Sequence, residues 1–452
     1  MDIQQSEWLD KVRQQFDFAP YPRVPLEKLP HDHYNDLFVH SLVTPHYLRD
    51  RHIVDTHGKY ILDVGCGSGY KSLILAIANP GAHVVGVDLS DASVELARLR
   101  FQHHGFENAE FHALSLKELP SLGLQFDYIN CDEVLYLLPE PVVGLQAMRS
   151  VLKPDGIIRS NLHSYLQRDS FYRAQDLFRM MGLMDGNPED FEIDIVKETM
   201  SSLRDNILLK VQTWGTKFET SENSEEVISE ILMNHLFQED KGYTISQLFA
   251  MFEAADLEFI NMVDWQSWQV ANLFSTTENL PDCWKPVFKG DSVADTLQLY
   301  ELLHPTHRLL DFWCGLPNSV EPLRSSRQWD MTDWQTCVVR LHPQLQIEVV
   351  KDDLVRCTTA LSPFEISRYI TMSAPGPLFL DSSAAIALLP LWDDPQSIQA
   401  LVDRYQTVRP PHPVTLQPIS PEAAFAEVQQ LLRQLEQCCY VLLEASEGTL
   451  IE

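Results

Sequence analysis

The stretch YILDVGCGSGYKSLILAIANPGAHVVGVDLS, residues 60–90, constrains the fold of this chain more than any other part of it. It begins with a short apolar run and passes through three glycines with the spacing G-x-G-x-G, at Gly65, Gly67 and Gly69. A segment with helical patterning follows, and then a second apolar run that ends at Asp88. Strand, glycine loop, helix and strand in this order predict a β-α-β unit with parallel strands.

The alternation of strand and helix patterns continues from residue 60 to about residue 160. The strand patterns are rich in Val and Ile without polar alternation, which is typical of parallel strands covered on both faces. We therefore predict an α/β fold with a doubly wound sheet. Helical patterning dominates 169–212 and 291–372.

Composition and proline content divide the chain into four predicted parts. Residues 276–290, STTENLPDCWKPVFKGD with its flanks, differ in composition from both sides and are the expected linker. The last part is expected to be mainly helical, and the order of strand, two helices, proline-rich loop, long helix and strand in 378–450 predicts a winged-helix-like unit. The predicted parts are an N-terminal helical and proline-rich segment (1–55), the main α/β domain (56–275), the linker (276–290) and the C-terminal domain (291–452).

The charge and the cysteines exclude several classes of function. A formal net charge of −30 repels nucleic-acid backbone, so we expect neither DNA nor RNA as a partner. The eight cysteines form no C-x-x-C pair, which removes support for a zinc or thioredoxin-like site, and no metal is expected. The N-terminus lacks the apolar core of a signal peptide, and no apolar run reaches about 18 residues, so we expect a cytoplasmic chain without a membrane span.

The glycine loop indicates a ligand that presses against backbone at the start of a helix, where unpaired N–H groups favour an anion. A dinucleotide fingerprint would need a third glycine at the position of Tyr70, and the lysine pattern of a phosphate loop is absent. Asp88 ends the second strand, where a carboxylate can accept both hydroxyls of a ribose. A plain turn between strand and helix, a nicotinamide site and a solvated N-cap at Asp88 remain alternatives.

LDVGCGSGYKS followed by VVGVDLS resembles motifs I and II of class I S-adenosylmethionine-dependent methyltransferases. The resemblance implies a seven-stranded Rossmann-like sheet with the order 3-2-1-4-5-7-6 and S-adenosyl-L-methionine as the cofactor. FDYINCDEVLYLLPEP is similar to motif IV of the same family. By this likeness the cofactor contacts come from the glycine loop, the second strand and the ends of the third and fourth strands, at Asp63, Gly65, Cys66, Gly67, Gly69, Asp88, Leu89, Leu114, Ser115, Asn130 and Cys131.

Three residues are candidates for catalysis on the side of the methyl acceptor: Glu133, Tyr136 and His163. The first two follow the fourth strand, where the Asn-Pro-Pro-Tyr signature of amide or adenine-amine methylation is absent, and the third follows the next strand. A sulfonium donor needs an aligned nucleophile in a dry site, and a general base only if the acceptor binds protonated. The alternatives are local packing residues and a structural histidine.

The segment FDFAPYPRVPLE has an extended backbone because its prolines exclude a regular helix. Phe16, Phe18 and Tyr21 on this segment are candidates for a lid over the cofactor mouth. A strap that only packs on the domain is the alternative. The segment resembles the PYPR element that precedes the catalytic domain in a group of bacterial methyltransferases.

The acceptor is the open point. We expect a protein side chain, because a small-molecule enzyme has little use for the added module 291–452, which is similar to regulatory domains of some protein lysine methyltransferases. The pattern also resembles cyanobacterial methyltransferases, which would make a phycobiliprotein asparagine a target. The alternatives are a small hydroxylated or quinone-like metabolite and a non-catalytic cofactor-binding partner protein. A C-terminal domain that only stabilises the fold or forms a homo-oligomer is also compatible with the sequence.

Overall fold

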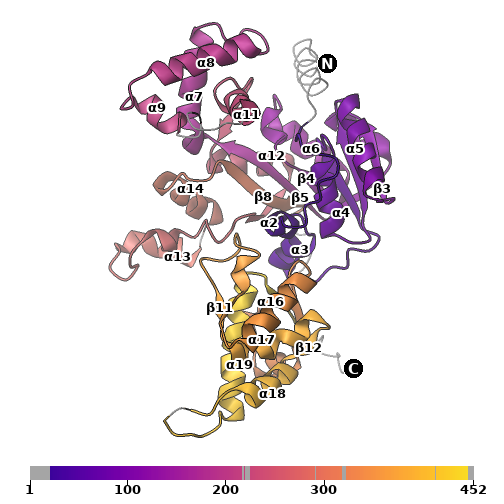
Figure 1. Cartoon of the computed structure of the whole chain (residues 1–452), viewed down its shortest axis with the longest axis vertical. Helices are drawn as coiled ribbons and strands as arrows, with labels where there is room; N and C mark the ends of the chain where they lie inside the picture. Colours follow the sequence, from indigo (N-terminus) through magenta and orange to yellow (C-terminus); the bar gives the residue numbers. More distant parts are fainter. Residues whose placement is uncertain are drawn as a thin grey trace.

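A computed structural model of the chain describes residues 21–215, 218, 224–290, 292–317, 322–412 and 414–445. Figure 1 shows a sheet with helices on both sides, a group of helices to one side of it, and a second unit built by the end of the chain. The predicted lid residues Phe16 and Phe18 lie outside the described residues.

A sheet of eight strands forms the centre of the first part of the chain. Its strands are β1 (Tyr60–Val64), β2 (His83–Asp88), β3 (Ala109–Ala113), β4 (Phe126–Cys131), β5 (Leu152–Ser164), β6 (Gly242–Tyr243), β7 (Glu258–Met262) and β8 (Leu309–Gly315). The order is β3-β2-β1-β4-β5-β8-β7, with β6 paired to β5 outside this path. The first five strands are parallel, and β8 runs antiparallel to β5 and β7. Without β6 this is the predicted order 3-2-1-4-5-7-6, and the predicted fold class is confirmed.

The central strands are buried on both faces because their side chains alternate between two apolar cores. On β1, Ile61 packs into the first core and Leu62 into the second, and both are fully buried. The helices of the first core are α2 (Tyr34–Val39), α3 (Val43–Asp50), α4 (Tyr70–Ala78) and α5 (Asp91–His103). The helices of the second core are α6 (Pro141–Ser150), α12 (Ile245–Ala255) and α14 (Val293–Leu303). This double burial explains the unbroken Val, Ile and Leu runs of the sequence.

A group of helices between β5 and β6 has an apolar core of its own, with Phe178, Val196 and Ile231 fully buried in it. The helices are α7 (Tyr165–Met180), α8 (Asp190–Ser202), α9 (Leu208–Thr213) and α11 (Ser224–Asn234). They leave the sheet where β5 ends, because Ser164 is the N-cap of α7 and its hydroxyl accepts a hydrogen bond from the backbone N–H of Gln167. In Figure 1 this group lies to one side of the sheet.

The predicted linker at 276–290 does not mark the end of the sheet. β8 lies beyond it and takes the position between β5 and β7. In β8, Leu310 and Phe312 pack into one core while Trp313 packs into the other, so the run LLDFWCG is a strand buried on both faces. The expectation that 291–372 is mostly helical is therefore wrong for this segment, where apolar continuity outweighs the helical patterning around it.

Residues 322–445 form the second unit, with the three-stranded sheet β12-β9-β13 and the pair β10-β11. Within 378–412 and 414–445, the strand and helix pattern expected for 378–450 is found. The winged-helix interpretation stays a prediction. The helices and strands are α15 (Met331–Thr336), β9 (Val338–Leu341), α16 (Glu348–Thr359), β10 (Phe364–Glu365), β11 (Phe379–Leu380), α17 (Ser382–Leu388), β12 (Gln396–Ser397), α18 (Ile398–Val408), α19 (Pro421–Gln437) and β13 (Val441–Glu444).

Short elements complete the described structure. They are the helix α13 (Lys285–Lys289) and the 3-10 turns η1 (Leu116–Leu122), η2 (Leu135–Leu137), η3 (Val270–Leu273), η4 (Asp282–Trp284), η5 (Ser326–Gln328), η6 (Ile366–Arg368) and η7 (Leu389–Trp392). No described helix is both long and apolar enough to cross a membrane.

The second unit is joined to the sheet domain through α2 and α3, which share one apolar core with it. At the centre of this contact lies the buried carboxylate of Glu436 on α19. Tyr47 on α3 donates its hydroxyl to Oε1 of Glu436 at 2.8 Å, Ser326 donates to Oε2, and Arg51 lies 3.6 Å away. The carboxylate therefore accepts hydrogen bonds from both the sheet domain and the second unit.

Glu436→Ala removes the acceptor for Tyr47 and Ser326 and leaves two buried hydroxyl groups without their main partner. We expect the free energy of unfolding to fall by about 2–3 kcal/mol, measured by urea denaturation. Gln434→Ala, at an exposed position two residues away on the same helix, is the control and should change stability by less than about 0.5 kcal/mol. Equal effects of the two substitutions would contradict the role of Glu436.

Candidate active site

The strand order reverses between β1 and β4: the chain passes from β1 outward through β2 to β3 and then returns to β4 on the other side. In open α/β sheets, ligands bind outside the carboxyl ends of the strands at such a point. The glycine loop after β1, Asp88 at the end of β2 and Glu133 after β4 all lie at this edge. The topology therefore brings the predicted site residues to one place.

The glycine loop has a backbone that few other residues would adopt. Gly65, Gly67 and Gly69 have φ of 72°, 50° and 77°, in the left-handed region. A Cβ atom at Gly65 would also overlap the side chain of Val134, which follows β4. The N–H of Gly65 donates to the carbonyl of Val87 at 2.8 Å, which fixes the loop to β2. The loop is thus held in one shape by the protein itself.

Asp88 lies across from the loop, partly exposed, and its carboxylate is fixed by two backbone N–H groups. Gly67 donates to Oδ2 and Ser90 donates to Oδ1, both at 2.9 Å. These two bonds orient the carboxylate of Asp88 beside the loop. Leu89, also partly exposed, follows directly.

The end of β3 lies beside Asp88, because the N–H of Leu114 donates to the carbonyl of Asp88 at 2.8 Å. Leu114 is partly exposed and can flank a ligand held there. Ser115 is placed differently: its hydroxyl donates to Glu118 at 2.6 Å within the capping box of η1. The described contacts of Ser115 are therefore local, and its contact with a cofactor stays a prediction.

Asp63 lies beneath the loop and is 2% exposed. Ser72 on α4 donates to Oδ2 at 2.5 Å, and Asn130 on β4 donates to Oδ1 at 2.8 Å. Burial raises the pKa of Asp63 to about 6, and the two hydrogen bonds oppose this shift. Asp63 and Asn130 thus join β1, α4 and β4 beneath the ligand edge, and their direct contact with a cofactor stays a prediction.

The two cysteines predicted at the site are buried packing residues. Cys66 in the loop is 2% exposed and Cys131 at the end of β4 is fully buried. Burial raises the pKa of the Cys131 thiol to about 12 and also raises that of Cys66, so neither is a ready nucleophile.

Glu133 is the residue at which the backbone leaves β4, and its φ of 61° is unusual for a residue other than glycine. Such strain costs about 1–3 kcal/mol and persists where the surroundings impose it. Here the N–H of Glu133 donates to Oδ1 of Asn161 at 2.9 Å, and Tyr136 donates its hydroxyl to Oε2 of Glu133 at 2.6 Å. The ring of Tyr136 in turn stacks on His163 with centroids 3.8 Å apart. The three predicted acceptor-side residues therefore form one cluster.

His163 is held by partners on both ring nitrogens. Nδ1 lies 2.6 Å from Oδ1 of Asp240, and Nε2 lies 3.1 Å from a guanidinium nitrogen of Arg308. Because arginine only donates, Nε2 accepts and the proton is on Nδ1. Burial lowers the pKa of His163, and its hydrogen bond with Asp240 opposes this shift. The lone pair of Nε2 is directed at Arg308, and a catalytic role of His163 stays a prediction.

Arg308 and Asp240 were not found by sequence reasoning. Arg308 immediately precedes β8 and forms an ion pair with Glu133, while Asp240 precedes β6 and accepts from Arg168 at 2.6 Å. Both residues lie more than seventy positions from His163 along the chain, and no local motif surrounds them. If β8 had been predicted as a strand beside β5, the position of Arg308 just before it would have indicated a residue near His163.

A second group of charged residues, near the carboxyl edge of the sheet, was also not found from the sequence. Arg159 on β5 donates to Asp311 on β8 at 3.1 and 2.7 Å and to His40 at 3.0 Å. Lys71 pairs with Asp132 at 3.1 Å. Burial alone would raise the pKa of Asp132, but Arg159 and Lys71 outweigh it and hold that pKa well below its usual range. Burial and Arg159 lower the pKa of His40, which is therefore neutral.

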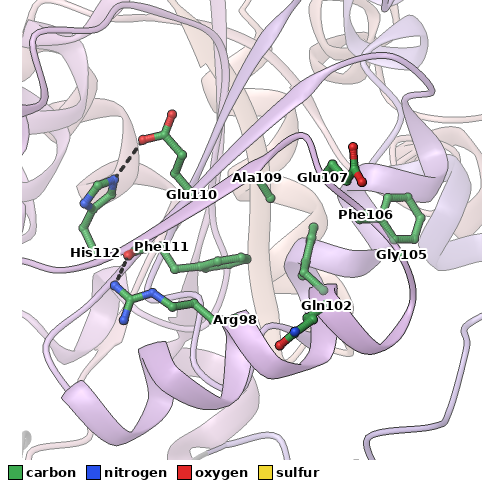
Figure 2. A pocket seen from close by; sticks show the side chains of 10 residues that line it. Arg98, Gln102, Gly105, Phe106, Glu107, Ala109, Glu110, Phe111 and His112 are labelled. Atoms are coloured by element: carbon green, nitrogen blue, oxygen red, sulfur yellow. Dashed lines mark hydrogen bonds and ion pairs between the residues drawn. The ribbon is translucent and has the colours of Figure 1, made fainter.

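A surface cavity of about 550 Å³ lies elsewhere, between α5 and β3. Figure 2 shows its lining, with Arg98 and Gln102 on the helix and Phe111 on the strand. Neither the glycine loop nor Asp88 contributes to it. This cavity is therefore separate from the candidate site at the carboxyl edge.

Residues 55–241 match a family model described as a methyltransferase domain. This part of the chain is similar to methyltransferase domains. The matched range holds the glycine loop, Asp88 and the cluster of Glu133, Tyr136 and His163, and the predicted methyltransferase is confirmed at this level.

Two relatives are similar to this chain in sequence. An uncharacterized protein of Synechococcus sp. is 28% identical over 260 residues, 56% of this chain and 60% of that protein. The ubiquinone biosynthesis O-methyltransferase of Acinetobacter baylyi is 33% identical over 123 residues, 26% of this chain and 51% of that enzyme. The chain thus spans less than two thirds of the length of these relatives.

PKMT2 from Rickettsia typhi resembles the chain in structure, with a TM-score of 0.59 and 16% identity, over 95% of this chain and 78% of that one. A structure of PKMT2 in complex with AdoHcy gives a TM-score of 0.57 at 15% identity, over 94% and 78%. At this identity the likeness shows the fold alone. It extends over the methyltransferase domain and the second unit together.

Asp63→Asn removes the buried charge while keeping the side-chain shape. The folded pKa of about 6 exceeds the ordinary value of 3.8, so the folded chain binds more protons in this range and the contribution of Asp63 to stability falls as the pH rises through it. The compared quantity is the free energy of unfolding of Asp63→Asn minus that of the natural chain. We expect this difference to favour the variant more at about pH 7.5 than at about pH 4.5. Urea unfolding at both pH values measures this, and a difference independent of pH would contradict it.

Proposed function

We propose that the chain transfers a methyl group from S-adenosylmethionine to a side chain of another protein. The observation that carries the proposal is the glycine loop of a methyltransferase domain with the carboxylate of Asp88 fixed across from it. The acceptor cluster around Glu133 lies at the same edge of the sheet. The choice of a protein acceptor rests on the position of the second unit.

The residues at the edge fit this methyl donor. N–H groups at the start of α4 suit the carboxylate of its methionine part, and Asp88 suits its ribose hydroxyls. Leu89 and Leu114, both partly exposed beside Asp88, suit its adenine. AdoHcy, the form of the donor without its methyl group, is present in a PKMT2 structure with the same fold. When bound, the donor supplies a methyl group on a positively charged sulfur.

The chain's own residues align the acceptor and exclude water from it. Glu133 is fixed by Asn161, Tyr136 and Arg308, so its carboxylate presents a pre-ordered charge beside the donor edge. We assign His163 a positioning role, because its unprotonated nitrogen, Nε2, accepts a hydrogen bond from Arg308. A proton acceptor is needed only for an acceptor that arrives protonated, and Glu133 is then the nearest partly exposed carboxylate of the cluster.

The second unit supports a protein acceptor because it contacts the helix that borders the site. Asn35 on α2 donates to the hydroxyl of Thr371 at 3.0 Å and accepts from its N–H at 2.9 Å. On the same helix, Asp36 lies 4.0 Å from Lys71, which reaches the acceptor edge through Asp132. A large folded surface next to the edge suits a macromolecular acceptor more than a metabolite.

A small hydroxylated or quinone-like metabolite is the second candidate acceptor. Ubiquinone biosynthesis O-methyltransferases of Acinetobacter baumannii strains are 34% identical over 115 residues, 24% of this chain. That match favours the alternative, but it spans only 24% of this chain and 48% of those enzymes. Recognition of the acceptor by the second unit would therefore separate the two candidates.

Asp88→Ala removes the carboxylate proposed to hold the ribose. We expect the affinity for S-adenosylhomocysteine, measured by calorimetry on the full chain, to fall by about a hundredfold or more, since two charge-assisted hydrogen bonds are lost. Glu107→Ala is the control, because Glu107 is exposed and lines the separate cavity of Figure 2. If the control weakens binding and Asp88→Ala does not, that cavity is the donor site.

Incubation of the chain with labelled S-adenosylmethionine in a cell lysate tests the acceptor. We expect label in a protein band, and we expect Asp88→Ala to abolish it. Label in the organic extract would support the metabolite instead. Donor binding without label in either fraction would support a non-catalytic cofactor-binding protein.

A further inference from the structure

Residues 21–30, which we name the strap, lie directly on the glycine loop. The carbonyl of Tyr21 accepts from the N–H of Ser68 at 2.9 Å, and the carbonyl of Pro22 accepts from the hydroxyl of Ser68 at 2.8 Å. A Cβ atom at Gly67 would overlap the carbonyl oxygen of Tyr21. The central glycine of the loop is therefore needed for the approach of the strap.

The strap and the loop are fastened together by one buried side chain, Arg100 on α5, which is 0% exposed. Its Nε donates to the carbonyl of Ser68 at 2.9 Å, which lies in the loop. Its two terminal nitrogens donate to the carbonyls of Val24 at 2.8 Å and Pro25 at 2.9 Å, which lie in the strap. Arginine alone offers donors in a rigid planar fork, so a single residue can join both segments.

Tyr21 is the first residue of the strap and is 50% exposed. Its carbonyl is bonded to the loop. Partial burial raises the pKa of its phenol, the charge of Glu133 adds to this shift and the charge of Arg308 opposes it.

We propose that Arg100 is a positioning residue that holds the strap closed over the methyl donor. The proposal rests on the glycine loop being the donor site. Donor entry and release require the strap to move, because its backbone lies on the loop. Arg100 then controls how long the donor stays bound, and it touches neither the donor nor the acceptor itself.

Arg100→Lys keeps the positive charge but lacks the planar fork. We expect the dissociation constant of S-adenosylhomocysteine to rise about tenfold, the loss of one charge-assisted hydrogen bond, with faster dissociation in stopped-flow measurements. The KM for the donor should rise more than kcat falls. Arg98→Lys is the matched control: Arg98 lies on the same helix but donates to the carbonyl of Phe111, away from the strap.

Trypsin gives a second readout on the full chain. Arg23 and Lys28 are exposed residues of the strap, so a closed strap should be cleaved after them more slowly when S-adenosylhomocysteine is bound. We expect this protection in the natural chain and in Arg98→Lys, and its loss in Arg100→Lys.

The outcomes separate this proposal from the proposed function. If the natural chain does not bind S-adenosylhomocysteine, the proposed function fails and this inference falls with it. If the natural chain binds S-adenosylhomocysteine and Arg100→Lys equals it in affinity, dissociation rate and protection, only the role of Arg100 is overturned. The role of Arg100 is also overturned if Arg98→Lys behaves like Arg100→Lys. Should Arg100→Lys lower the melting temperature strongly, Ser68→Ala decides, because it removes only the bond to Pro22; unchanged dissociation in that variant overturns the proposal.

Discussion

The architecture of the site depends on one buried guanidinium. Arg159 on β5 donates to Asp311 on β8, to Asn130 on β4 and to His40, which directly follows α2. It also lies 3.4 Å from Asp132 after β4. An unpaired charge in this position would be costly, so the partners must all be present for the sheet to close. The same side chain therefore fixes the last central strand, the helix beneath the second unit and the residues that lead to Glu133.

Much of the sheet was predictable because its constraints are local. The apolar runs of β1 and β4 and the glycine loop between β1 and α4 are legible over a few residues, since each strand is buried on both faces. β8 escaped prediction for a physical reason: it lies inside 291–372, where helical patterning dominates, and its partner strands β5 and β7 come from earlier parts of the chain. The linker predicted at 276–290 precedes β8, so the sheet continues beyond it.

The candidate site could be predicted where its residues belong to local motifs. Asp88 and the glycine loop belong to a motif in which sequence neighbours are also neighbours in space. Arg308 and Asp240 join the cluster of Glu133, Tyr136 and His163 from distant segments, and neither carries a local pattern that shows which residue it pairs with. The glycines were read as space for a cofactor, whereas Gly65 and Gly67 are also required by Val134 and by the strap.

The second unit is a fixed part of this architecture. Its apolar core is continuous with that of α2, α3 and one face of the sheet, with Phe38 and Tyr47 fully buried between them. Close-packed interiors do not slide gradually, so rearrangement of this unit would require breaking the shared core and the contacts of Glu436. The strap is held differently, because its backbone carbonyls accept the hydrogen bonds that join it to the glycine loop and to Arg100.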